Sequence, residues 1–163
     1  MAGLFYLLTF VSGVIALVAG STMVVANGIA TVAYVAVTVL FYVLFKPVDA
    51  RLSMVAALFS FAGCAVGAMT ALHVSLVPIN ALAFFGIYCV LIGYLIGRST
   101  FLPSWLGGLM AFGGLSWLTF GWRTLAHALY PYNLAPGIIA EGTLTVWLLV
   151  FGGKASRPVA RTT

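Results

Sequence analysis

Charged side chains are scarce in this sequence. Of its 163 residues only 6% are Asp, Glu, Lys or Arg, whereas 64% are hydrophobic, and the mean hydropathy is +1.21. An ordinary soluble domain has about a quarter charged residues. A chain with so little charge cannot cover its surface with polar groups, and lipid is the solvent that such a surface suits. The scarcity of charge therefore excludes an ordinary soluble domain and predicts an integral membrane protein.

Acidic residues and cysteines are also few. Two Asp or Glu residues stand against seven Lys or Arg, which gives a net charge of +5. The basic residues occur singly at the ends of apolar runs and do not interleave with aromatics, so the excess does not indicate a nucleic-acid partner. Cys64 and Cys89 fall inside apolar runs without polar companions. We interpret them as small buried side chains and not as a disulfide or a metal site.

Six apolar runs are long enough, or nearly so, for membrane spans of about 20 residues. The expected spans are residues 4–20, 28–45, 52–72, 80–97, 104–126 and 138–153. No Lys or Arg precedes the first run, so we interpret it as a retained span and not as a secretory signal peptide. A break near Ser21, Thr22, Asn27 and Gly28 separates the first two runs. If that break is helical, the two runs form a tight hairpin or one kinked helix, and the count is five.

The predicted fold class is therefore all-α, a polytopic transmembrane helical bundle of six spans over residues 1–153. A polar, disordered tail follows over residues 154–163. With six spans, one side of the membrane receives all but one of the basic residues, namely Lys46, Arg51, Arg98, Lys154, Arg157 and Arg161. The other side receives Arg123. Because Lys and Arg are concentrated on the cytoplasmic side of membrane proteins, both termini and the tail are predicted to be cytoplasmic.

Glycines at helical spacing predict close contacts between spans. Gly63 and Gly67 are four residues apart, as are Gly93 and Gly97, and this spacing lets two helices approach closely in lipid. The fifth run is especially rich in glycine, with five of them between positions 107 and 121. We expect that run to be a central, closely packed helix.

Several of these segments resemble a known family. The opening residues 3–13 (GLFYLLTFVSG) resemble the start of an uncharacterised family of bacterial multi-pass membrane proteins, domain of unknown function 4386. Residues 40–48, 85–99 with 101–107, and 136–152 fit the same pattern, so the resemblance extends over nearly the whole chain. It implies several membrane helices in a bacterial inner membrane, and it implies no activity.

Glu141 is the acidic residue that falls inside an apolar run. It lies about one turn into the sixth run, and an ionisable group inside a span is a functional-site hypothesis by default. Two structural interpretations compete with this one. The carboxylate would suit the positive end of a helix near the headgroups. It would also suit an ion pair with Arg123, which the short connection between the last two runs should bring to similar depth.

Other polar residues are expected at the same outer end of the bundle. His127 follows Arg123 by four residues and shares its helical face, and His73 ends the third run. The predicted ligand-binding group, called here the outer group, consists of Arg123, Glu141, His127, His73, Asn80 and Tyr130. Tyr130 and the neighbouring aromatics are equally typical of an interfacial aromatic belt.

The outer group is compatible with several functions. The favoured one is binding of a hydrophobic or amphipathic small molecule, with Arg123 holding an anionic head. Catalysis with Glu141 or His127 as acid or base is an alternative, although no nucleophile or His-Glu-x-x-His motif is present. Haem ligation by His73 and His127 is another, and no cofactor or metal is otherwise implied. A further alternative is an accessory subunit of a larger membrane complex, or a homo-oligomer, and neither would need a ligand-binding site. Membrane lipid is expected as a partner in every case.

Overall fold

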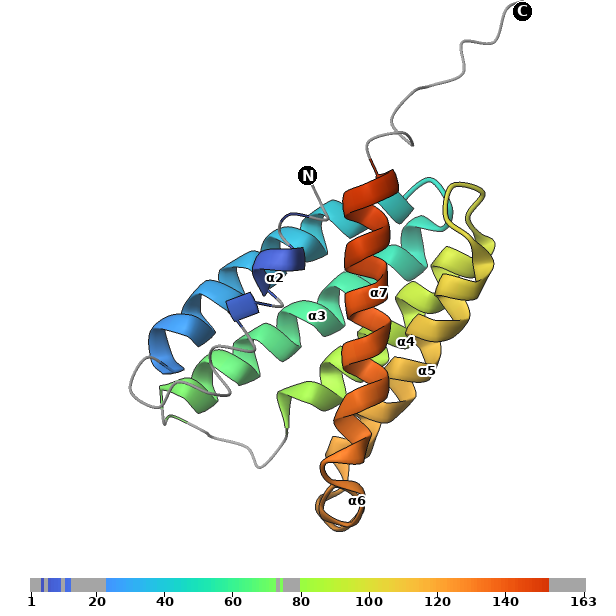
Figure 1. Cartoon of the computed structure of the whole chain (residues 1–163). Helices are drawn as coiled ribbons and strands as arrows, with labels where there is room; N and C mark the ends of the chain where they lie inside the picture. The colour runs from blue at the N-terminus through green and yellow to red at the C-terminus, as the bar shows by residue number, and fades with distance from the viewer. Residues whose placement is uncertain are drawn as a thin grey trace, which may run out of the picture.

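The structure is a computed structural model that describes residues 4, 6–9, 11–12, 23–72, 74 and 80–152. The described elements are all helical. They are α2 (Met23–Phe45), α3 (Ala50–Ala71), α4 (Ala81–Arg98), α5 (Ser104–Leu118), α6 (Arg123–Leu129) and α7 (Ala135–Phe151), with short 3-10 turns η2 (Thr119–Gly121) and η3 (Tyr132–Leu134). The long helices lie side by side as a bundle, and α6 lies at one end of it (Figure 1). The described residues confirm the predicted all-α class.

Four helical segments of the described chain are long and apolar enough to cross a membrane. They are Gly28–Phe45, Ala50–Ala71, Ala81–Arg98 and Tyr132–Phe151. This is a multi-pass membrane protein. The predicted fifth span is not among these four, because its helix α5 has 15 residues. Most of the predicted first span and the whole tail from residue 154 lie outside the described residues, so the count of six spans stays a prediction.

The predicted boundaries differ from the structure at three places. Asn27 and Gly28, expected in a break, lie inside α2, which begins at Met23. The fifth span, expected to reach residue 126, ends as an α-helix at Leu118, and extended backbone at Trp122 separates it from α6. Residues 127–137, expected as a loop, contain the end of α6, the turn η3 and the start of α7.

Contacts from a distant segment accompany the early end of α5. The hydroxyl of Ser116 donates to the backbone carbonyl of Asn133, and the Asn133 side-chain amide donates to the hydroxyl of Thr119 at 3.0 Å. The Thr119 hydroxyl in turn donates to the Ser116 carbonyl at 2.7 Å. These bonds satisfy groups that a helix end leaves unpaired, and they join the end of α5 to η3. The two bonds to Asn133 join residues distant in sequence, so hydropathy could not predict them.

Side-chain caps explain two of the helix starts. The Asp49 carboxylate accepts a hydrogen bond from the Leu52 backbone N–H at 3.0 Å, and the Asn80 side chain accepts one from the Leu82 N–H at 2.9 Å. Both residue types are favoured at this position because they satisfy a free N–H of the first turn. Asn80, predicted as part of the outer group, is thus the cap of α4.

Glycine brings α4, α5 and α7 into backbone contact. A Cβ atom on Gly93 would lie 2.6 Å from the Gly107 carbonyl oxygen, and one on Gly107 would lie 2.5 Å from the Gly93 carbonyl oxygen. On the α7 side, a Cβ on Gly113 would lie 2.7 Å from the Cβ of Ala140. This arrangement agrees with the prediction that the glycine-rich run is a central, closely packed helix.

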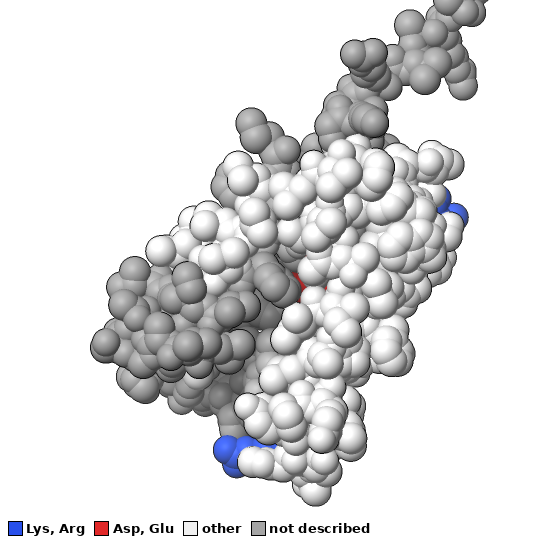
Figure 2. Space-filling model, in the orientation of Figure 1, with Lys and Arg blue, Asp and Glu red and all other residues white. Residues whose placement is uncertain are grey.

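Basic residues lie at the two ends of the bundle. The α2–α3 connection, the α4–α5 connection and the end of α7 share one end, whereas α6 lies at the other (Figure 1). Lys46, Arg51 and Arg98 are exposed at the first end, and Arg123 is exposed on α6. Figure 2 shows blue atoms toward opposite ends of one face and a small red area between them. The four described basic residues thus lie at the predicted ends, and which end is cytoplasmic stays a prediction.

Candidate functional site

The predicted outer group does not form one cluster among the described residues. Arg123 and His127 lie on α6 and are exposed, and the Tyr130 side chain is 63% exposed. His73 lies outside the described residues. Among the described residues, Arg123, His127 and Tyr130 form an exposed polar and aromatic surface without hydrogen bonds or ion pairs to one another.

Glu141 is partly buried near the middle of α7, apart from the rest of the outer group. Because α7 begins at Ala135, three residues before the expected start, Glu141 is nearly two turns into the helix and near the middle of the apolar stretch Tyr132–Phe151. Its Oε1 atom accepts hydrogen bonds from the Trp117 indole Nε1 at 3.1 Å and the Cys89 thiol at 3.6 Å. Its described side-chain partners therefore come from α5 and α4, and the anticipated pairing with Arg123 is not formed.

Three buried tyrosines surround this carboxyl group. Tyr6 and Tyr88 are 1% exposed and Tyr34 is 7% exposed. The ring centroid of Tyr34 lies 6.1 Å from that of Tyr6 and 6.0 Å from that of Tyr88. All three hydroxyls lie close enough to the Glu141 carboxyl group to interact with it electrostatically. We call this group the interior cluster: Tyr6, Tyr34, Tyr88, Cys89, Trp117 and Glu141.

The tyrosine hydroxyls of the interior cluster have no hydrogen-bond partner of normal geometry. An unsatisfied polar group in the interior costs about 1–3 kcal/mol, and such groups usually mark bound water, an ion or a functional site. Neighbouring polar groups are satisfied. The Thr38 hydroxyl donates to the Tyr34 carbonyl at 2.8 Å and lies 2.5 Å from the Ser60 hydroxyl. Outside the interior cluster, the side-chain oxygen of Asn133 is the other described buried side-chain atom without a partner, so the unsatisfied hydroxyls are concentrated in the interior cluster.

Local packing fixes the orientation of the carboxyl group. A Cβ atom on Gly137 would collide with the Trp117 ring, so glycine at this position lets the indole lie against α7. The carboxyl group of Glu141, one turn further along α7, then accepts a hydrogen bond from the indole N–H. Tyr88 and Cys89 are consecutive on α4, so this helix supplies both an unsatisfied hydroxyl and a thiol donor.

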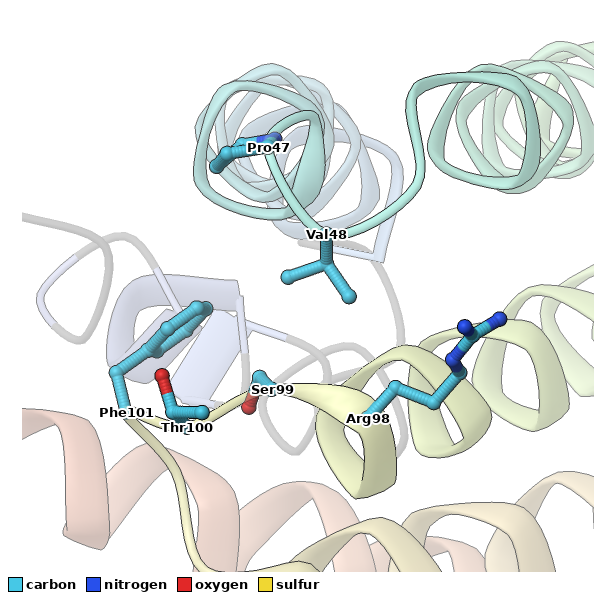
Figure 3. A pocket seen from close by; sticks show the side chains of 6 residues that line it. All are labelled: Pro47, Val48, Arg98, Ser99, Thr100 and Phe101. Atoms are coloured by element: carbon cyan, nitrogen blue, oxygen red, sulfur yellow. The ribbon is translucent and has the colours of Figure 1, made fainter.

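A pocket of about 390 Å³ lies at the other end of the bundle from α6. Its lining residues are Pro47, Val48, Arg98, Ser99, Thr100 and Phe101 (Figure 3). The Arg98 guanidinium donates to the Tyr94 hydroxyl at 3.3 Å, and the Ser99 hydroxyl donates to the Ile96 carbonyl at 2.8 Å. The side chains of Arg98 and Ser99 therefore already have hydrogen-bond partners in α4. Within the described ranges, no group of three His, Cys, Asp or Glu is placed to hold a metal ion.

Sequence reasoning identified Glu141 but missed its partners. Cys64 and Cys89 are buried and free, as predicted, yet Cys89 also donates to the carboxyl. The predicted outer group contains Tyr130, which lies beyond the end of its run, whereas Tyr34 and Tyr88 lie well inside theirs. A hydroxyl in the middle of an apolar run needs a partner, and that signal was available in the sequence.

The comparison with known families covers most of this cluster. A model of the family described as Domain of unknown function (DUF4386) matches residues 79–152. The match confirms the resemblance to DUF4386 over this part of the chain. The matched segment holds α4 to α7 and so includes Tyr88, Cys89, Trp117 and Glu141.

Other comparisons add a relative of unknown activity. An uncharacterised protein of Archaeoglobus fulgidus is 28% identical over 139 residues, which cover 77% of this chain and 81% of that protein. No solved structure matches the chain. Like DUF4386 itself, this relative carries no activity in its description, so function must be argued from the residues of the interior cluster.

Proposed function

We propose that this membrane protein binds a small hydrophobic or amphipathic molecule at the interior cluster, with Glu141 as the group that orients it. The observation that carries the proposal is the set of three buried tyrosine hydroxyls without partners around one carboxyl group. A polar network that serves only the fold would satisfy its own donors and acceptors, because a partly satisfied network is costlier than an apolar core. A bound molecule would supply the missing partners.

The surroundings of the cluster suit such a ligand. The tyrosine rings pack with Phe41 and Phe85 at centroid distances of 5.6 Å from Tyr6 and 4.6 Å from Tyr34. Small-molecule sites are largely apolar and aromatic, with a few polar groups that set orientation. Glu141 is partly exposed, which favours access for a ligand arriving from the bilayer.

The test is mass spectrometry of small molecules that co-purify with the protein in mild detergent. The wild-type protein should retain a defined molecule, and Glu141→Gln should lose it, because the amide keeps the shape of the side chain but not its charge. Arg123→Ala is the matched control, since Arg123 is exposed on α6. We expect this variant to retain the molecule.

Two other results would favour the alternatives from the sequence. Loss of the molecule in Arg123→Ala but not in Glu141→Gln would move the site to the outer group. Stoichiometric co-purification of a partner protein, with no small molecule in any sample, would favour an accessory subunit.

A further inference from the structure

Both described donors to the Glu141 carboxyl group reach the same oxygen. Trp117 and Cys89 both donate to Oε1. None of the described residues donates a hydrogen bond of normal geometry to Oε2. The two donors thus hold the carboxyl group in place.

No positive charge of the described chain compensates this carboxyl group. The described basic residues Lys46, Arg51, Arg98 and Arg123 are all exposed, and they lie in end connections or at helix ends. An uncompensated charge deep in a membrane protein is costly, and such residues are normally paired. A cationic ligand would provide the counter-charge, whereas an anionic ligand would be repelled.

The hydrogen-bonding groups of the cluster distinguish among cations. A primary ammonium group has three N–H donors. The hydroxyls of Tyr34 and Tyr88 are buried without a hydrogen-bond partner of normal geometry. The described donors to Glu141 leave its Oε2 atom as a further acceptor, and the aromatic rings can face the positive charge. A quaternary ammonium group has no N–H donor and would leave the hydroxyls unpaired.

Resting on the proposed function, we infer that the ligand of the interior cluster is an amphipath with a primary ammonium head and an apolar tail. Its head donates to Glu141 and to the tyrosine hydroxyls, and its tail lies among the apolar side chains of the bundle. This inference reverses the charge expected from the sequence, where Arg123 was to hold an anionic head.

Three probes of equal tail length test the inference: dodecylamine, dodecyltrimethylammonium and dodecanoate. Each is titrated at neutral pH into the full-length protein in phosphatidylcholine nanodiscs, and calorimetry with empty nanodiscs subtracted gives the dissociation constant. Dodecylamine should bind saturably, about one per chain, and at least about tenfold more tightly than either other probe. This factor corresponds to one hydrogen bond to a charged group.

Substitutions separate the contribution of the Glu141 charge to binding from that of the tyrosine hydroxyls. Glu141→Gln should weaken dodecylamine binding by about tenfold to a hundredfold. Tyr34→Phe and Tyr88→Phe should each weaken it several-fold and leave dodecyltrimethylammonium unaffected. The two phenylalanine variants keep the ring and the carboxyl group, so they decide the matter if Glu141→Gln fails to fold.

Failure of the inference is distinguishable from failure of the proposed function. Equal binding of the two cations, or tighter binding of dodecanoate, would overturn the ammonium assignment. If the wild-type protein still retained a molecule that Glu141→Gln loses, the interior site itself would stand. If no molecule is retained and no probe binds saturably, both proposals are wrong.

Discussion

The hydroxyls of Tyr34 and Tyr88 lie in the interior without hydrogen-bond partners, so each lowers the stability of the ligand-free protein. Replacing Tyr88 by Phe removes this hydroxyl and keeps the ring. We expect Tyr88→Phe to stabilise the ligand-free protein by about 1 kcal/mol or more, because an unsatisfied buried group costs about 1–3 kcal/mol. Reversible unfolding in detergent, by circular dichroism, measures the change.

Tyr94→Phe is the control for this prediction. Tyr94 is on the same helix but is exposed, and its hydroxyl accepts a hydrogen bond from Arg98. We expect a change within about 0.5 kcal/mol, as for most surface substitutions. A loss of stability in Tyr88→Phe, larger than that in Tyr94→Phe, would mean that the Tyr88 hydroxyl is satisfied and has no need of a ligand.

At the residue scale, the sequence predicted the importance of Glu141 but not its depth or partners. The difference follows from where α7 begins. Asn133 is tied to the end of α5, and α7 starts at Ala135. These contacts join residues distant in sequence, so a hydropathy profile of the last run alone could not place Glu141 beside Trp117 and Cys89.

At the scale of helices, α4 and α5 pack through facing glycines. Gly107→Ala should destabilise the protein, because its Cβ would lie 2.5 Å from a backbone oxygen of Gly93. Overpacking of this kind costs about 1–3 kcal/mol. Gly108→Ala is a matched control on the next residue of α5, where a Cβ would meet nothing within 4 Å. Unfolding in a denaturing detergent compares the two variants.

Equal stability of the two glycine variants would contradict this packing. The spacing of glycines in the sequence predicted that the fifth run would be closely packed. It did not predict that Gly93 would face Gly107, since any of several glycine pairs fits the same spacing. Which helices are neighbours depends on the whole bundle.

At the scale of the whole molecule, the charges predict an orientation in the membrane. Lys46→Cys, at the end of α2, should react with a membrane-impermeant maleimide only from the cytoplasmic side. His127→Cys, on α6, should react only from the outside. Both positions are exposed, whereas the natural Cys64 and Cys89 are buried, so the unmodified protein is a suitable blank. Sealed vesicles of opposite orientation provide the measurement, and labelling of both variants from one side would contradict the predicted topology.

The central claim is that the interior cluster, and not the exposed outer surface, holds a ligand. The most direct measurement is the amount of small molecule retained per chain by the wild-type protein and by Glu141→Gln, purified in parallel and matched for folding by circular dichroism. We expect close to one retained molecule per wild-type chain, and we expect the folded Glu141→Gln variant to have lost most of the retained molecule. Equal retention by the two proteins would contradict the account.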